Sequence, residues 1–111
     1  MFAIRVEFPA TGPTVMTVVG ELDIATAPGL AQALMDFASG GARVLLDLRQ
    51  LTFLDCRGLS VLLAARQRFV ASGGDLVLVE VRGVARRVVD LTGSAAALGL
   101  APADTPDRAV G

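Results

Sequence analysis

The chain has 111 residues, a formal net charge of −1, one cysteine and no histidine. The missing histidine removes the commonest general base and the commonest metal ligand, which excludes much of enzymology, and a single cysteine excludes an intramolecular disulfide. Acidic residues and arginines are dispersed, so no basic surface for nucleic acid is expected, and no apolar run approaches the roughly 20 residues of a membrane span.

The length is that of one ordinary domain. We expect residues 1–111 to form it, with the core over about 2–93 and a weakly patterned C-terminal segment over 94–111. The first ten residues do not resemble a signal peptide, because Arg5 and Glu7 interrupt them and no cleavage-site pattern follows. The expectation is therefore a cytoplasmic protein, and no pattern calls for a cofactor or a metal.

Two strands are predicted at the start of the chain. Apolar residues alternate with Ala3, Arg5 and Glu7 over residues 2–8, which is the period of a half-buried strand. Turn residues follow, and residues 14–20 then read as a second strand, which we expect to pair with the first.

A helix is predicted after this pair of strands. Thr26 can cap it, with Pro28 in its first turn, and the Ser-Gly-Gly at 39–41 ends it. The expected apolar face comprises Leu30, Leu34 and Phe37.

The middle of the chain predicts a strand, a loop and a long helix. Residues 42–48 read as a strand, and the continuous apolar run at 44–46 is typical of a strand that is covered on both faces. A loop that carries residues 53–55 leads into a helix over about 56–71. The expected apolar stripe of this helix comprises Leu59, Leu62, Leu63, Phe69 and Val70. Arg66 interrupts the stripe, so either its aliphatic stem snorkels or the stripe is narrower.

The last patterned segments are a buried strand over 75–81 and a third helix that ends at Thr92-Gly93. The expected apolar face of that helix comprises Val84, Val88 and Leu91. Beyond residue 94, a short strand near Leu100 and a stub of helix after Thr105 are the only signals. The order of elements predicts an α/β (α+β-like) fold, a mixed four- to five-stranded sheet with helices mainly on one face.

Three stretches of the chain, at 18–30, 44–65 and 72–93, carry motifs that are specific as a set. They are Glu-Leu-Asp, then Asp-Leu 24 residues later, then Asp-X-X-Gly-Leu at a helix start, and Leu-Thr-Gly at the end of another helix. Together they resemble the STAS domain, in the free-standing form of bacterial anti-sigma factor antagonists. The resemblance extends nearly end to end and is weakest after Ser94.

The resemblance implies a binding protein and not an enzyme. Members of the family bind an anti-sigma factor, often a serine kinase, and so release a sigma factor. The kinase can reverse this by phosphorylating a serine or threonine in the loop that opens the second long helix. A helix N-terminus tolerates phosphate, whereas a dianion in a contact surface disrupts the complex. No nucleic acid and no direct membrane insertion are expected, and a homodimer stays open.

Arg57 departs from the family pattern. That pattern is Asp, then Ser or Cys, then the acceptor Ser or Thr, then Gly and Leu, and arginine holds the acceptor position of residues 55–59. Without a hydroxyl, the usual phospho-switch cannot operate there. Arg57 is either a solvated cation in a loop that has lost its regulation, or a ligand for a partner carboxylate or anion. A cation in a first helical turn costs roughly 0.3–1 kcal/mol, which slightly favours the second interpretation.

The other residues of the site also allow a structural role or a partner-binding role. The expected partner-binding residues are Asp23, Thr26, Phe53, Leu54, Asp55, Cys56, Arg57, Gly58 and Ser60. Asp55 also suits the N-cap of the second helix, whereas Asp23 directly follows a strand and is better explained by a partner. Ser60 is an unfavourable substitute acceptor, because it lies about one turn inside the helix. Cys56 is expected to be a packed structural thiol, with redox sensing as the alternative.

Two other functions stay open beside anti-sigma factor antagonism. A STAS accessory subunit of a lipid-exporting ABC transporter shares the fold and commonly lacks an acceptor serine. A redox-responsive binding module centred on Cys56 would form peroxide-induced dimers. Catalysis is the least expected, because the chain lacks a histidine base, a metal-ligand set and a paired nucleophile.

Overall fold

The computed structural model describes residues 1–38 and 40–100. Along the chain the elements are β1 (Phe2–Glu7), β2 (Thr14–Leu22), α1 (Ala27–Met35), β3 (Arg43–Asp47), β4 (Leu51–Leu54), α2 (Cys56–Ala71), β5 (Asp75–Val79) and α3 (Gly83–Leu91). Helix α2 has the predicted bounds, whereas α1 ends before Phe37, which packs against the core from the following turn. Within the described ranges, no helix combines the length and the apolar character that crossing a bilayer requires.

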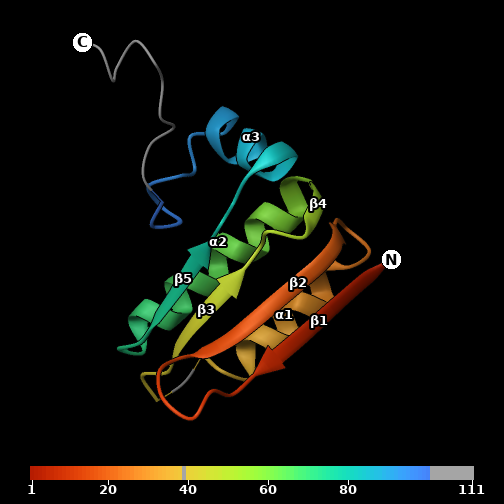
Figure 1. The fold of residues 1–111 in the computed structure, drawn as a ribbon. Coiled ribbons are helices and arrows are strands. Elements are labelled where there is room, and N and C mark those ends of the chain that lie inside the picture. The colour runs from red at the N-terminus through yellow and green to blue at the C-terminus, as the bar shows by residue number, and fades with distance from the viewer. Residues whose placement is uncertain (39, 101–111) are drawn as a thin grey trace, which may run out of the picture.

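Over the described residues, the sheet has five strands of mixed orientation. Strand β1 is antiparallel to β2, as predicted. Strand β2 runs parallel to β3 in its first half and to β4 in its second half, and β3 is parallel to β5. Helices α1 and α2 lie behind one face of the sheet, and α3 lies beyond its end next to β4 (Figure 1). The predicted mixed sheet with helices mainly on one face is confirmed.

Strand β4 corrects one expectation from the sequence. The sequence predicts a loop that carries residues 53–55, but Phe53 and Leu54 lie in β4 and pair with Glu21 and Leu22 of β2. Four residues without apolar alternation give little signal for a strand. The consequence is functional, because β4 places the start of α2 directly beside the end of β2.

The described part of the segment after α3, which ends at residue 100, carries no strand. The expectation of one near Leu100 is wrong, because residues 94–100 form turns, in which the Leu98 N–H donates to the Ser94 carbonyl at 3.1 Å. Leu98 is nevertheless buried and so belongs to the core. The helix expected after Thr105 lies outside the described residues.

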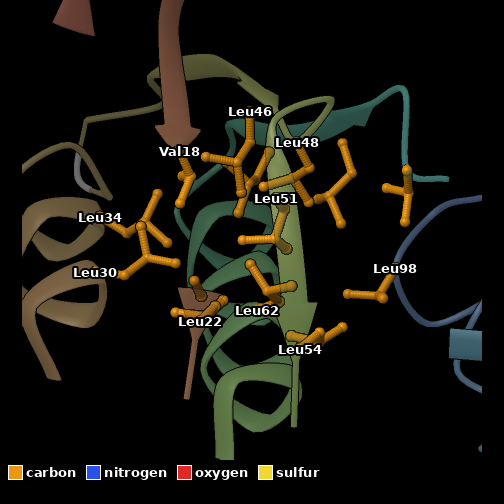
Figure 2. Close-up of a cluster of buried hydrophobic side chains, with 14 of the residues drawn as sticks. Val18, Leu22, Leu30, Leu34, Leu46, Leu48, Leu51, Leu54, Leu62 and Leu98 are labelled. Atoms are coloured by element: carbon orange, nitrogen blue, oxygen red, sulfur yellow. The ribbon is translucent and has the colours of Figure 1, made fainter. Parts of the chain in front are cut away.

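The hydrophobic core lies between the sheet and helices α1 and α2. Met16 and Val18 of β2, and Leu46 of β3, are fully buried on the face toward the helices. Leu45 points to the other face and is only half-buried, so the expectation that this strand is covered on both faces is wrong. Figure 2 shows the central cluster, whose labelled members are Val18, Leu22, Leu30, Leu34, Leu46, Leu48, Leu51, Leu54, Leu62 and Leu98.

The buried stripe of α2 is narrower than predicted. Ala65 is buried, and Val70 is 50% exposed. Arg66 sits at the edge of the stripe, with Nη2 3.6 Å from Asp75 Oδ1 and Nη1 donating to the Ala97 carbonyl at 3.4 Å. The stripe is therefore narrower than predicted, and the Arg66 guanidinium reaches polar partners at its rim, as a snorkelling arginine does.

The apolar face predicted for α3 is right only at Val88, which is partly buried and packs against the core. Ala85 and Val89 are buried, whereas Val84 is 54% exposed and Leu91 78% exposed. Both sets of residues repeat every three or four positions, so helical periodicity alone does not distinguish them.

Asp47, at the end of β3, gives a testable pH dependence. The Arg49 guanidinium donates to both carboxylate oxygens, at 2.7 Å for Nη2 to Oδ2, and this hydrogen bonding lowers the pKa of Asp47 below its ordinary value of 3.8. A lowered pKa adds stability that is complete above the unfolded-state pKa and is lost as the pH falls through the folded-state pKa. We expect Asp47→Asn to reduce the urea midpoint at pH 7 and to reduce it less at pH 3. An equal reduction at both values would contradict the assignment.

Candidate functional site

The loop between β2 and α1 is a tight turn built by Asp23 and Thr26. Asp23 Oδ1 accepts from the N–H groups of Ala25 (2.9 Å) and Thr26 (3.1 Å). The Thr26 hydroxyl donates to the Glu21 carbonyl at 2.8 Å and accepts from the Asp23 N–H at 2.9 Å. Thr26 does occupy the position before α1, but its side chain forms no capping hydrogen bond with the helix. The capping prediction is wrong, because the hydroxyl turns back to the end of β2.

Asp55 joins this loop to the start of α2. Its Oδ1 accepts from the Gly58 N–H at 2.9 Å, which confirms the predicted N-cap. Its Oδ2 accepts from the Ile24 N–H at 3.2 Å, 31 residues away in the sequence. Its own N–H donates to the Leu22 carbonyl at 3.2 Å. One carboxylate therefore fixes the position of α2 relative to the turn at residues 23–26.

Gly58 allows the first turn of α2 to approach β2. A Cβ at this position would lie 2.7 Å from Leu22 Cγ, 2.8 Å from the Leu22 carbonyl oxygen and 3.0 Å from Leu54 Cδ1. Any side chain there would have to displace one of these groups. Gly58 and Leu54 are both buried, so they support the site from beneath.

Above them lies an exposed surface, which we call the Asp55 surface and define by the side chains of Ile24, Phe53, Cys56, Arg57 and Ser60. Ile24 is 65% exposed and Phe53 41% exposed. The other three are also exposed, and Arg57 forms no ion pair among the described residues. Large apolar side chains beside a charge at one end of a sheet are typical of a protein contact surface.

The Asp55 surface carries the thiol of Cys56 and the hydroxyl of Ser60. The Cys56 thiol is free and exposed, so the expectation of a packed structural thiol is wrong. The Ser60 hydroxyl donates to the Cys56 carbonyl at 2.9 Å and lies in the second turn of α2. The described residues contain no group of three or more histidine, cysteine or acidic side chains that could hold a metal ion.

The sequence-based prediction did not include Ile24. The available signal in the sequence was an apolar residue directly after Asp23, where a strand is expected to end. Only the structure shows that its N–H reaches Asp55 and that its side chain lies in solvent next to α2.

Comparison with known proteins identifies relatives along most of the chain. The family model described as the STAS domain matches residues 5–103. The anti-sigma-B factor antagonist of Bacillus subtilis (strain 168) is 30% identical over 78 residues, which cover 70% of this chain and 72% of that relative.

Solved structures show the same fold. An anti-sigma factor antagonist from Mycobacterium paratuberculosis is 30% identical, with a TM-score of 0.74 over 99% of this chain and 92% of that chain. The phosphorylated form of the Bacillus cell fate determinant SpoIIAA has a TM-score of 0.67 at 22% identity, over 97% of this chain and 96% of that chain. At 22% identity this second likeness concerns the fold alone. The Asp55 surface lies within the segment that the family model covers.

Proposed function

Because the chain belongs to the STAS domain family, we propose that it is an anti-sigma factor antagonist that acts in the cytoplasm by binding an anti-sigma factor and so releases a sigma factor. Two relatives that are 30% identical to it carry the name of anti-sigma factor antagonist. The proposed activity is binding, without catalysis of its own.

One structural observation supports this proposal for this chain in particular. Asp55 holds the turn at residues 23–26 against the start of α2 through hydrogen bonds to Ile24 and Gly58. This arrangement brings Ile24 onto one exposed surface with Phe53 and Arg57, which lie near each other but far from Ile24 in the sequence. Apolar and aromatic side chains with an arginine are the residue types that contribute most to protein interfaces. The Asp55 surface is the proposed contact for the anti-sigma factor.

We further propose that the partner is of the serine-kinase type and that the complex is not controlled by phosphorylation at residue 57. Arg57 occupies the acceptor position and has no hydroxyl. Ser60 is one turn further into α2, and its hydroxyl is bonded to the backbone of the same helix. Binding of the anti-sigma factor would then persist under conditions in which phosphorylation prevents binding by a relative with an acceptor serine.

Affinity capture tests the partner. The tagged protein is used to capture its partners from a lysate of its own source, and a variant with Ile24→Glu and Phe53→Glu is the control for the Asp55 surface. We expect an ATPase-type anti-sigma factor with the wild type and a loss of it with the control variant. Capture of ABC transporter subunits would instead identify a transporter accessory subunit, and peroxide-dependent dimers that disappear in Cys56→Ser would identify a redox module.

Phosphorylation is tested with the captured anti-sigma factor and ATP. We expect no gain in mass for the wild type, and a gain of about 80 Da for Arg57→Ser, which places a hydroxyl in the exposed first turn of α2. The phosphate would there meet unpaired N–H groups of the helix N-terminus. A phosphopeptide from the wild-type protein that contains Ser60 would contradict constitutive binding.

A further inference from the structure

A surface groove runs between α1 and α2 and shares Arg57 and Ser60 with the Asp55 surface. Its apolar lining comes from Ala31 and Met35 of α1 and from Val61, Ala64 and Ala71 of α2. From residue 57 to residue 71 the lining follows α2 for about 21 Å, at a rise of roughly 1.5 Å per residue.

Among the described residues, the lining of this groove contains two arginines and no acidic residue. Arg57 and Arg68 both belong to the lining. They share one face of α2 with Val61 and Ala64, because these four positions follow the three- and four-residue spacing of a helix. Eleven residues separate the two arginines, which corresponds to about 16 Å or three turns.

Neither guanidinium is neutralised by a neighbour. Among residues 1–38 and 40–100, Arg57 and Arg68 take part in no ion pair and their side chains donate no hydrogen bond, whereas Arg49 and Arg66 lie within 4 Å of carboxylates. Arg68 is placed favourably in the last turn of α2, but Arg57 lies in the first turn, where the helix dipole disfavours a cation. The charge of Arg57 therefore has no structural explanation within the described chain.

We propose that this groove binds an amphipathic helix of the anti-sigma factor, with an apolar stripe against Ala31, Val61 and Ala64 and with Asp or Glu residues about three turns apart that pair with Arg57 and Arg68. This inference rests on the proposed function, and it names the partner segment. The groove lies between two packed helices. A third helix can pack there, with its side chains filling the apolar floor of the groove. The arginines select for acidic partners, since charge complementarity at the rim governs specificity.

The test uses a fluorescent peptide of about 18 residues, five helical turns, that carries leucines on one face and two glutamates eleven positions apart. Its control has lysines in place of the two glutamates. We expect the acidic peptide to bind the wild type at least tenfold more tightly than the control, and Arg57→Glu and Arg68→Glu to weaken it about tenfold each. The double variant should instead prefer the lysine peptide. Arg87→Glu, on the exposed side of α3, is the matched control and should change nothing.

Two further measurements locate the site. Amide chemical shifts of the wild type on titration with the acidic peptide should move most around Ala31, Val61 and Ala64, and dispersed spectra show that the variants fold. Ala64→Trp should block binding without a change of charge. Equal binding of both peptides, shifts confined to other surfaces, or equal effects of Arg68→Glu and Arg87→Glu would overturn the inference.

Binding measurements with the captured anti-sigma factor distinguish a failure of this inference from a failure of the proposed function. Arg68→Glu lies away from the Asp55 surface, so it should weaken anti-sigma factor binding at least tenfold only if the groove is used. Capture of that factor with undiminished binding to Arg68→Glu would overturn the groove and leave the proposed function standing. Selective binding of the acidic peptide without capture of any anti-sigma factor would overturn the proposed function, and with it the partner named here.

Discussion

Gly58→Val is expected to lower the free energy of unfolding by about 3 kcal/mol, in the upper part of the range for overpacked sites. The new Cβ would lie 2.8 Å from the Leu22 carbonyl oxygen, which belongs to the sheet backbone and cannot rotate away as a side chain can. Two additional methyl groups would enlarge the clash. The first turn of α2 would have to move, and with it the Asp55 surface, so binding of the anti-sigma factor should fall at least tenfold.

Gly29→Val is the matched control for this prediction. Gly29 also lies in a helix, α1, but apart from its chain neighbours and the nearby backbone of that helix, no atom lies within 4 Å of a Cβ built there. The two substitutions change helix propensity by the same few tenths of a kcal/mol, so the difference between them measures the contact of Gly58 with β2. Urea unfolding of both variants gives this difference directly. Equal stability of the two variants would contradict the proposed close approach.

Much of this fold follows from local pattern. Helix α2 was predicted with its observed bounds, because Asp55 is a strong N-cap and the glycines after Ala71 end the helix. The pairing of β1 with β2 follows from alternation and a turn between them. Each of these signals lies within a few residues of the element that it defines.

Two of the errors have a different origin, since they concern contacts with the end of β2. Strand β4 exists because Phe53 and Leu54 pair with the end of β2, beyond a register shift between Gly20 and Glu21. The Thr26 hydroxyl bonds to the Glu21 carbonyl, although the same residue at the same place could have capped α1. In both cases the local sequence permits two structures, and a contact with the end of β2 selects one.

The sequence singles out part of the candidate site, but it indicates neither Ile24 nor the geometry. Asp55, Cys56 and Arg57 stand out from their positions in one motif. The hydrogen bond from the Ile24 N–H to Asp55 crosses 31 residues and has no local signal. The groove with Arg57 and Arg68 likewise requires the packing of α1 against α2, which a single helical pattern does not contain.

Asp55→Ala is expected to lower the free energy of unfolding by about 1–3 kcal/mol, because it removes an N-cap and leaves a second N–H without its acceptor. The lost partners are the N–H groups of Gly58 and Ile24. Without the second bond the turn at residues 23–26 is no longer fixed to α2. We therefore expect binding of the anti-sigma factor to fall at least tenfold, measured by calorimetric titration of the captured partner. Asp36→Ala, at the exposed end of α1, should stay within about 0.5 kcal/mol of the wild type.

Asp55→Asn separates the two roles of this carboxylate. Asparagine caps helices about as well as aspartate, so its oxygen can still accept from the Gly58 N–H. Its amide nitrogen would then be directed toward the Ile24 N–H, and two donors cannot bond to each other. If the position of the 23–26 turn governs recognition, Asp55→Asn should retain most of the stability of the wild type and lose binding to the same extent as Asp55→Ala. Full binding by Asp55→Asn would instead mean that the cap alone matters, and that the anti-sigma factor does not depend on the link between the two segments.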